Sequence, residues 1–555
     1  MLIDRVSRQL LRAPELEPLL RALDAGDDAT LAVAQSARAT VLAALWARDP
    51  RPCLLVVPGE ESADRTARTL AAWLGRDAVC RYPMRQDHPW SDSACDDAVV
   101  GARCQAIARL SAGERCVVVA SARSLLRRVP PVGSGYFASS TFSVGDEVPF
   151  EDMGALLVGM GYSDAGSVDA PGTFHVHGDA VDVFPAQATS PVRIEFFGDE
   201  IDRVRRMVSS TGQTIGELEE VRVSPCREMA FTDQTVARAT RALYNRAQSD
   251  SRLAADLELI SQRAADPTLE RYLPQLYGST ASPLEHVSSD ALVVLAEPRA
   301  LFDDCVHAFD EVEASARTHR ASVEGLYTAP RQMDFGRQQR LSFASIMRAG
   351  TGAATAELAV RQPGVAGSDA KLLGRLRQLV ADDAAIVFAV PDRGARESLE
   401  LRMGDERIPF EESLGASAEN RGPSAPPLRR SMVTFVDAPV PAGIVVPTAH
   451  LAIFSVSDLA SRTAKARRSR RRVDPTSVTF PFKPGDYVVH ATHGIALFSD
   501  IVRQEVGGRE RDYFLLEYSG GDKLFVPLEQ VDRITRYVGP DGDAPRLTRL
   551  NTADW

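Results

Sequence analysis

Five short runs of mostly apolar residues constrain the fold of this chain more than any other feature. They are Cys53–Val57, Cys116–Ala120, Ala291–Leu295, Ala385–Val390 and Leu451–Ser455. A strand that is apolar along its length is buried on both faces, as in parallel sheets covered by helices on both sides. The stretches between the runs have helical patterns. The runs therefore predict α/β layers.

A chain of 555 residues is too long for one hydrophobic core, and ordinary domain sizes predict a multidomain protein of roughly three to five units. Between Pro130 and Pro225 the pattern changes to short strands separated by glycines, and the α/β pattern then resumes. We therefore expect one sheet domain interrupted by a small α+β insert. The expected units are the two pieces of this domain, the insert, a further α/β domain, a basic linker and a C-terminal module, with boundaries at 1–128 and 226–342, 129–225, 343–460, 461–479 and 480–548.

The C-terminal unit has an all-β pattern. Gly485–His490, Tyr513–Tyr518 and Lys523–Pro527 are short runs rich in β-branched and aromatic residues, with glycine turns between them. Strands of this length and spacing predict a small barrel-like module.

Composition limits the environment and the partners. The net charge of −11 means that any contact with DNA is local, and no apolar run is long enough to cross a bilayer. The N-terminus lacks the layout of a signal peptide, and the seven cysteines form no Cys-x-x-Cys pair, so we expect reduced thiols and a cytoplasmic protein. One basic segment is either a solvated linker or a phosphate contact, and its arginines are Arg467, Arg468, Arg470, Arg471 and Arg472.

The sequence offers no catalytic or metal site. A Gly-Lys-Ser/Thr phosphate loop is absent, and the segment Leu31–Thr40, where such a loop might open the first domain, contains neither glycine nor lysine. Ser36 and Thr40 are expected to cap or pack a helix. The pair His175 and His177 lacks a third ligand, so we expect a structural or surface role.

Two segments carry a specific resemblance to a known family. Phe482–Ala496, continued by Asp512–Tyr518 and Asp522–Pro527, resembles the RNA-polymerase-interacting module shared by transcription-repair coupling factors and the CarD family. Asp182–Pro185 followed by Val192–Asp202 is similar to the domain that these factors share with the repair protein UvrB. Both segments in this order resemble the N-terminal part of a coupling factor.

The resemblance implies a fold class, and it implies which part of the family's proteins carries the catalytic activity. The fold would be a degenerate, UvrB-like α/β domain around an α+β insert, a further α/β domain and a Tudor-like β-barrel. This part would bind no cofactor and catalyse nothing. In the family an ATP-dependent translocase on double-stranded DNA follows, which would use ATP and magnesium, and this chain ends at Trp555 soon after the module.

The resemblance also implies a UvrA-binding surface on the insert. The family's contacting arginine and phenylalanine correspond to Arg193 and Phe197, and Glu195 lies between them on the same face of an alternating strand. From the residues alone, the favoured interpretation is that Phe197 is a core residue and Arg193 part of a surface ion pair. A second family arginine is replaced by His177, which cannot make a bidentate contact.

For the polymerase module, the resemblance implies that an exposed strand edge pairs with a strand of the polymerase β subunit. The matching residues are Val502, Arg503, Gln504, Glu505 and Val506, and a plain solvated hairpin is the alternative. Replacing Gln504 by proline, which removes a backbone donor, is the test that the sequence suggests.

Two other classes of protein remain as alternatives. An ATP-dependent helicase or nuclease subunit would need the phosphate loop that the sequence lacks. A CarD-like transcription regulator with an unrelated N-terminal body would bind polymerase but not UvrA.

Overall fold

The computed structural model forms two compact units, Met1–Ala464 and Lys465–Trp555, each described here by itself. The residues that the structure describes are 2–91, 95–264, 266–335, 338–345, 354–363, 369–390, 392–411, 427–436, 440, 443–455, 458, 485–490, 494–506, 509–527, 534–536 and 547–548.

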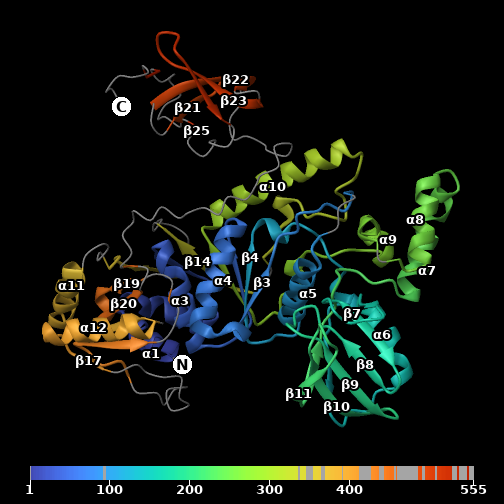
Figure 1. Ribbon diagram of the computed structural model, residues 1–555, viewed down its shortest axis with the longest axis horizontal. Helices are drawn as coiled ribbons and strands as arrows, with labels where there is room; N and C mark the ends of the chain where they lie inside the picture. Colours follow the sequence, from blue (N-terminus) through green and yellow to red (C-terminus); the bar gives the residue numbers. More distant parts are fainter. Residues whose placement is uncertain are drawn as a thin grey trace. The chain divides into compact units, whose positions relative to one another are not determined.

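The centre of the first unit is a seven-stranded sheet in which all neighbouring strands run parallel (Figure 1). Its order is β15-β1-β14-β13-β2-β4-β3. The strands are β1 (Ala29–Val33), β2 (Cys53–Val57), β3 (Val79–Tyr82), β4 (Val117–Ser121), β13 (Leu292–Ala296), β14 (Gln339–Ala344) and β15 (Ala354–Leu358). Strands from before and after the insert thus share one sheet, which extends past residue 342.

Helices cover both faces of this sheet. Side chains of α1 (Leu2–Leu10), α2 (Glu17–Ala25), α3 (Gln35–Arg48) and α4 (Glu60–Leu74) share the buried core of one face. On the other face the core includes α5 (Asp97–Ser111) and α10 (Pro298–Thr318). The predicted apolar strands are therefore buried on both sides, as their composition requires.

A second α/β sheet lies beside this layer. Its order is β17-β18-β16-β20-β19, formed by β16 (Ala385–Ala389), β17 (Phe410–Glu411), β18 (Met432–Val436), β19 (Ile444–Val446) and β20 (Leu451–Ser455). One face packs against α11 (Asp369–Ala381) and α12 (Arg393–Asp405). The other face shares a core with α1, and Gln9 Nε2 donates a 2.6 Å hydrogen bond to the Ala449 carbonyl.

The insert is an α+β structure built on a six-stranded sheet of order β11-β10-β9-β8-β7-β6. The strands are β6 (Ser163–Asp164), β7 (Thr173–His177), β8 (Ala180–Val183), β9 (Val192–Phe197), β10 (Glu200–Met207) and β11 (Thr214–Leu218). Helix α6 (Met153–Gly159) and the pair β5 (Ser140–Ser143) and β12 (Glu220–Val223) contribute to its core. The chain then forms α7 (Asp233–Ala247), α8 (Ser251–Ser261) and α9 (Leu273–Tyr277) before returning to the large sheet.

A buried cluster of ions joins the end of the insert to the large sheet. Arg103, whose side chain is fully buried, donates to Glu228 at 2.7 Å and stacks over the Tyr82 ring. Arg85 donates to the same carboxylate at 3.0 Å. The other members are Asp87, Arg127 and Glu270. Three arginines therefore balance three carboxylates at this joint.

The second unit is a five-stranded antiparallel sheet of order β24-β23-β22-β21-β25. Its strands are β21 (Tyr487–His490), β22 (Gly494–Val506), β23 (Arg509–Glu517), β24 (Lys523–Pro527) and β25 (Ile534–Arg536). Among the described residues no pairing between β24 and β25 closes the sheet, so the expected Tudor-like barrel is not confirmed.

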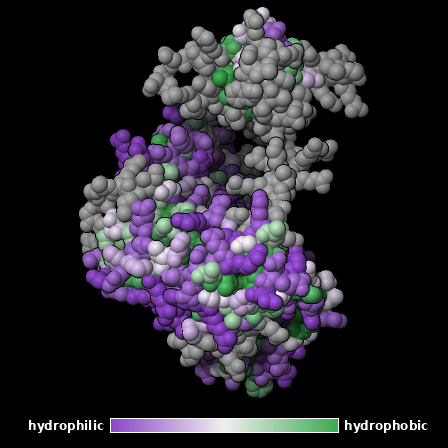
Figure 2. Space-filling view, turned by 90° about the vertical axis from the view of Figure 1, so that its left-hand side faces the viewer, coloured by the Kyte–Doolittle hydropathy of each residue, from purple (hydrophilic) through white to green (hydrophobic). Residues whose placement is uncertain are grey.

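In the described part of the chain, no helix has the length and apolar character needed to cross a membrane. Hydrophilic side chains predominate among the coloured residues of the face in Figure 2, with smaller hydrophobic areas between them.

Candidate docking surfaces

The outward face of β9 brings together the residues expected to bind UvrA. Val192, Ile194 and Phe196 are buried in the core of the insert, so the alternating Arg193, Glu195 and Phe197 face outward. Phe197 is 83% exposed at the end of the strand, where Gly198 takes a positive φ of 69° between β9 and β10. A large exposed ring beside charged side chains is typical of an interaction surface rather than of a core.

Asp182 on β8 organises this face, although its place at the start of the UvrB-like segment does not by itself predict such a role. Arg193 donates two hydrogen bonds to its carboxylate, Nε to Oδ1 at 2.7 Å and Nη2 to Oδ2 at 2.8 Å. His177 Nε2 lies 3.0 Å from the same Oδ2. Burial opposes ionisation of Asp182, but the bonds from Arg193 and His177 outweigh it, so the pKa of this carboxyl is lowered.

Other polar groups of the face are also paired across strands. Glu195 accepts a hydrogen bond from Arg205 on β10. The His177 ring stacks on His175, with centroids 5.6 Å apart, and His175 Nδ1 lies 3.3 Å from Asp164 Oδ1. Within the described ranges, no three histidine, cysteine or acidic side chains form a group suited to a metal ion.

The strand expected to bind polymerase is the distal half of β22. It pairs with β23 along Asp500–Val506. On its other edge, β21 pairs with Gly494–Leu497, and Phe498 exchanges hydrogen bonds with Gly485 and Asp486. From Ile501 to Val506, the described strands leave that edge without a partner strand. An edge of this kind can accept a further strand.

The register of β22 also fixes which amides face this edge. Val506 pairs with Arg509, and only two residues separate them, so this pair must exchange both backbone hydrogen bonds. Because hydrogen-bonded and non-hydrogen-bonded pairs alternate, the amide of Gln504 faces β23. The amides of Arg503 and Glu505 face the free edge instead. Proline at 504 would therefore disrupt the hairpin itself, and it is the wrong test of the edge.

The place where a nucleotide would bind in the large sheet is filled by an arginine. Only Ala34 separates β1 from α3, and Arg38 in the first turns of α3 pairs with the Glu297 carboxylate and donates to Ser345 Oγ at 3.0 Å. Helix α3 has no side-chain cap, and Thr40 is a packing residue that accepts a 3.2 Å hydrogen bond from Trp73 Nε1.

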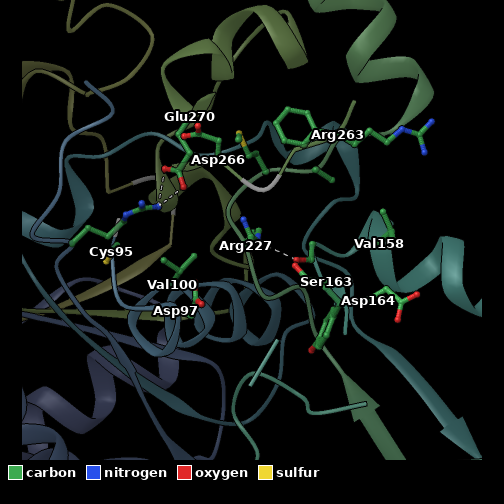
Figure 3. Close-up of a pocket in the computed structure, with 16 residues that line it drawn as sticks. Cys95, Asp97, Val100, Val158, Ser163, Asp164, Arg227, Arg263, Asp266 and Glu270 are labelled. Atoms are coloured by element: carbon green, nitrogen blue, oxygen red, sulfur yellow. Dashed lines mark hydrogen bonds and ion pairs between the residues drawn. The ribbon is translucent and has the colours of Figure 1, made fainter. Parts of the chain in front are cut away.

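A cavity of about 430 Å³ opens where the large sheet, the insert and the 227–270 segment meet (Figure 3). Arg227 lies between Ser163 of the insert and the carboxylates of Asp266 and Glu270, and its Nε donates to the Gly161 carbonyl at 3.1 Å. Glu270 is already paired with Arg85 and Arg127. Arg227 and Glu270 are thus engaged in contacts that connect the 227–270 segment with the insert and with the domain of the large sheet.

The basic residues 467–472 lie outside the described residues, so their contact with DNA stays a prediction. The side chains at 503–506 are also outside the described part, although their backbone belongs to β22.

Comparison with known families defines the class of protein. Residues 141–229 match the UvrB interaction domain, and residues 482–538 match the CarD-like/TRCF RID domain. The chain thus combines a domain of the UvrB interaction type with a domain of the CarD-like/TRCF RID type.

Curated relatives specify the resemblance further. The chain is similar over nearly its whole length to transcription-repair-coupling factors. These include the proteins of Bacillus subtilis (24% identical, 100% of this chain and 49% of the relative), Mycobacterium tuberculosis (30%, 98% and 47%) and Myxococcus xanthus (27%, 94% and 46%). The resemblance expected from the two motifs is confirmed, and the chain spans about half the length of the curated relatives it matches.

Proposed function

We propose that this chain is the docking part of a transcription-repair coupling factor. It would bind the β subunit of stalled RNA polymerase through the free edge of β22 and recruit UvrA through the outward face of β9. The observation that carries the proposal is the presence, in one chain, of domains matching two interaction families.

The UvrA assignment is supported by the chemistry of the β9 face. A protruding aromatic ring with an adjacent arginine is the composition of a binding hot spot. The Asp182 carboxylate holds the Arg193 guanidinium in place before any partner arrives, which lowers the entropic cost of binding.

The polymerase assignment is supported by the unpaired edge beside Ile501–Val506 and by its outward amides at 503 and 505. β-Augmentation draws most of its affinity from backbone hydrogen bonds, and a free edge of about five residues supplies enough donors and acceptors for a short added strand.

ATP hydrolysis and translocation on double-stranded DNA are assigned to sequence beyond this chain. The Arg38–Glu297 pair beside β1 supports this assignment, because it fills the end of the strand where a phosphate loop would lie. We expect no ATPase activity from this chain, with or without DNA. Measurable hydrolysis would favour the helicase or nuclease alternative.

The polymerase test uses co-elution of the chain with the N-terminal lobe of the β subunit. Arg503→Pro removes an amide that faces the free edge and keeps the bonds to β23, so the fold should persist while binding is lost. Gln504→Pro is the matched comparison, because it removes a bond within the hairpin and should also destabilise the module. Retained binding by a folded Arg503→Pro variant would refute the edge assignment.

The UvrA test compares two exposed aromatic residues. Phe197→Ala should abolish co-elution with UvrA, whereas Tyr244→Ala, which removes a ring that is 57% exposed on α7, should leave it unchanged. Binding of polymerase without any binding of UvrA by the wild-type chain, even at low salt, would favour the CarD-like regulator.

A further inference from the structure

One row of charged residues crosses four adjacent strands of the insert sheet (Figure 1). Asp182 on β8 is opposite Arg193 on β9, and Arg193 is opposite Arg205 on β10. Arg205 is in turn opposite Glu217 on β11. Val204 is buried in the core of the insert, so its neighbour Arg205 lies on the same outward face as Arg193. The row thus places two arginines between two acidic residues.

The two arginines of this row are like charges at directly opposite positions, an arrangement that destabilises a pair of strands. Residues paired in this way have Cβ atoms only about 4.5–5.5 Å apart. The chain supplies each arginine with a carboxylate. Asp182 accepts two hydrogen bonds from Arg193, and Glu195 on β9 pairs with Arg205 across the strands. The charges are therefore compensated, but the two cations remain neighbours.

Contacts within the chain use only a small part of the Arg205 guanidinium. Arginine carries five N–H donors. Within the described ranges, Arg205 donates one side-chain hydrogen bond, from Nη2 to Glu195, and its buried Nε has no acceptor. An unsatisfied buried donor and an opposing like charge both disfavour the folded chain. Such local conflicts are expected where a residue serves binding rather than the fold.

Solvent reaches both arginines, since the Arg193 side chain is 26% exposed and that of Arg205 is 29% exposed. The exposed ring of Phe197 lies on the same face of the sheet. Guanidinium groups bind carboxylates through paired, charge-assisted hydrogen bonds. An arginine pair beside a protruding ring therefore fits a protein surface that offers an acidic side chain next to an apolar pocket.

We propose that Arg205 is a further contact residue of the UvrA-binding surface, and that an acidic side chain of UvrA binds across Arg193 and Arg205. This inference rests on the proposed function of the β9 face and extends that surface to β10. Unused donors of both guanidiniums bond to the partner carboxylate, and its negative charge reduces the repulsion between the two cations.

The test measures the affinity of the chain for UvrA by calorimetry. Arg205→Ala should weaken binding at least about tenfold, the loss expected when a central charged contact is removed. Arg206→Ala is the matched control, because Arg206 follows on the same strand but is opposite the buried Val192 and lines the groove between the insert and the large sheet. Its affinity should equal that of the wild type. Circular dichroism checks that both variants are folded.

A second comparison separates direct contact from an effect of Arg205 through Glu195. If Arg205 meets UvrA itself, Arg205→Ala should weaken binding about tenfold in a Glu195→Gln background as well. The affinity of the wild type should also fall more steeply with added salt than that of Arg205→Ala. An Arg205→Ala change without effect in the Glu195→Gln background would overturn the direct contact.

The outcomes for the inference and for the proposed function are distinct. Unchanged UvrA affinity of Arg205→Ala, together with loss of binding by Phe197→Ala, would overturn the inference and leave the proposed function intact. A wild-type chain that does not bind UvrA would refute the proposed UvrA docking, and the role of Arg205 with it.

Discussion

Replacing Glu228 by alanine should destabilise the large sheet more than any surface change. Glu228 is 4% exposed and pairs with both Arg103 and Arg85. In the wild type, the three arginines and three carboxylates of this joint cancel. The variant leaves one positive charge uncompensated in a buried site, a change that costs about 3–5 kcal/mol. Arg103 keeps the bonds of its Nη1 to the Pro83 and Ser124 carbonyls, but its Nε loses its acceptor and its charge has no counter-ion at Glu228.

Urea unfolding followed by tryptophan fluorescence measures this effect. Trp46, Trp73 and Trp90 all belong to the domain of the large sheet, so the signal reports mainly on it. The matched control is Glu397→Ala on α12, which removes an exposed pair with Arg393 and should change the free energy of unfolding by less than about 0.5 kcal/mol.

The contribution of Glu228 to the free energy of unfolding should also depend on pH. Burial opposes ionisation of Glu228, but Arg103 and Arg85 outweigh it, so the pKa of Glu228 is lowered in the folded state. Its contribution is therefore fully present above the unfolded pKa of about 4.3 and is lost as the pH falls through the folded pKa. The difference between wild type and variant should be constant from pH 8 to pH 6 and shrink in acid. A difference below about 1 kcal/mol at pH 7 would refute the charge-balance reasoning.

Three further changes test the insert. Asp182→Asn removes the charged acceptor of the two Arg193 hydrogen bonds and should lower the free energy of unfolding, measured by urea titration, by about 1–3 kcal/mol. It should also weaken UvrA binding, measured by calorimetry. Phe197→Ala should cost at least about 2 kcal/mol of UvrA binding without changing the melting temperature, because the ring is 83% exposed. Gly161→Ala should lower the melting temperature, since its φ is +89° and the added Cβ would lie 2.9 Å from Arg227 Cβ; an unchanged melting curve would contradict this geometry.

Five of the buried strands, β2, β4, β13, β16 and β20, could be predicted from the sequence to within one residue, because burial on both faces leaves a continuous apolar run. Two other strands of the large sheet, β14 and β15, could not. Strand β14 reads Gln339–Ala344 and β15 reads Ala354–Leu358, and each buries only alternate side chains. A half-buried strand carries no run of apolar residues, so these two strands are assigned to the sheet only by their pairing, β14 with β1 and β13 and β15 with β1.

The placement of side chains on the outward face of β9 could also be predicted in part. Alternation along β9 places Arg193 and Phe197 on one face, and the structure bears this out. The role of Asp182 could not be derived, because its partner is 11 residues away and becomes adjacent only when β8 pairs with β9. The orientation of the Gln504 amide likewise depends on the hairpin register, which the sequence does not specify.

The two proposed docking surfaces rely on different chemistry, and this difference yields a final prediction. The β9 face presents particular side chains, so alanine at Phe197 or Arg193 should remove UvrA binding. The β22 edge presents backbone groups, so alanine at Arg503 or Glu505 should leave polymerase affinity within about threefold, a change of less than 1 kcal/mol. Proline at 503 should abolish that affinity. Titration of each partner with all five variants checks this pattern. A large loss of polymerase binding from alanine at Arg503 or Glu505 would show that side chains, rather than the strand edge, make the contact.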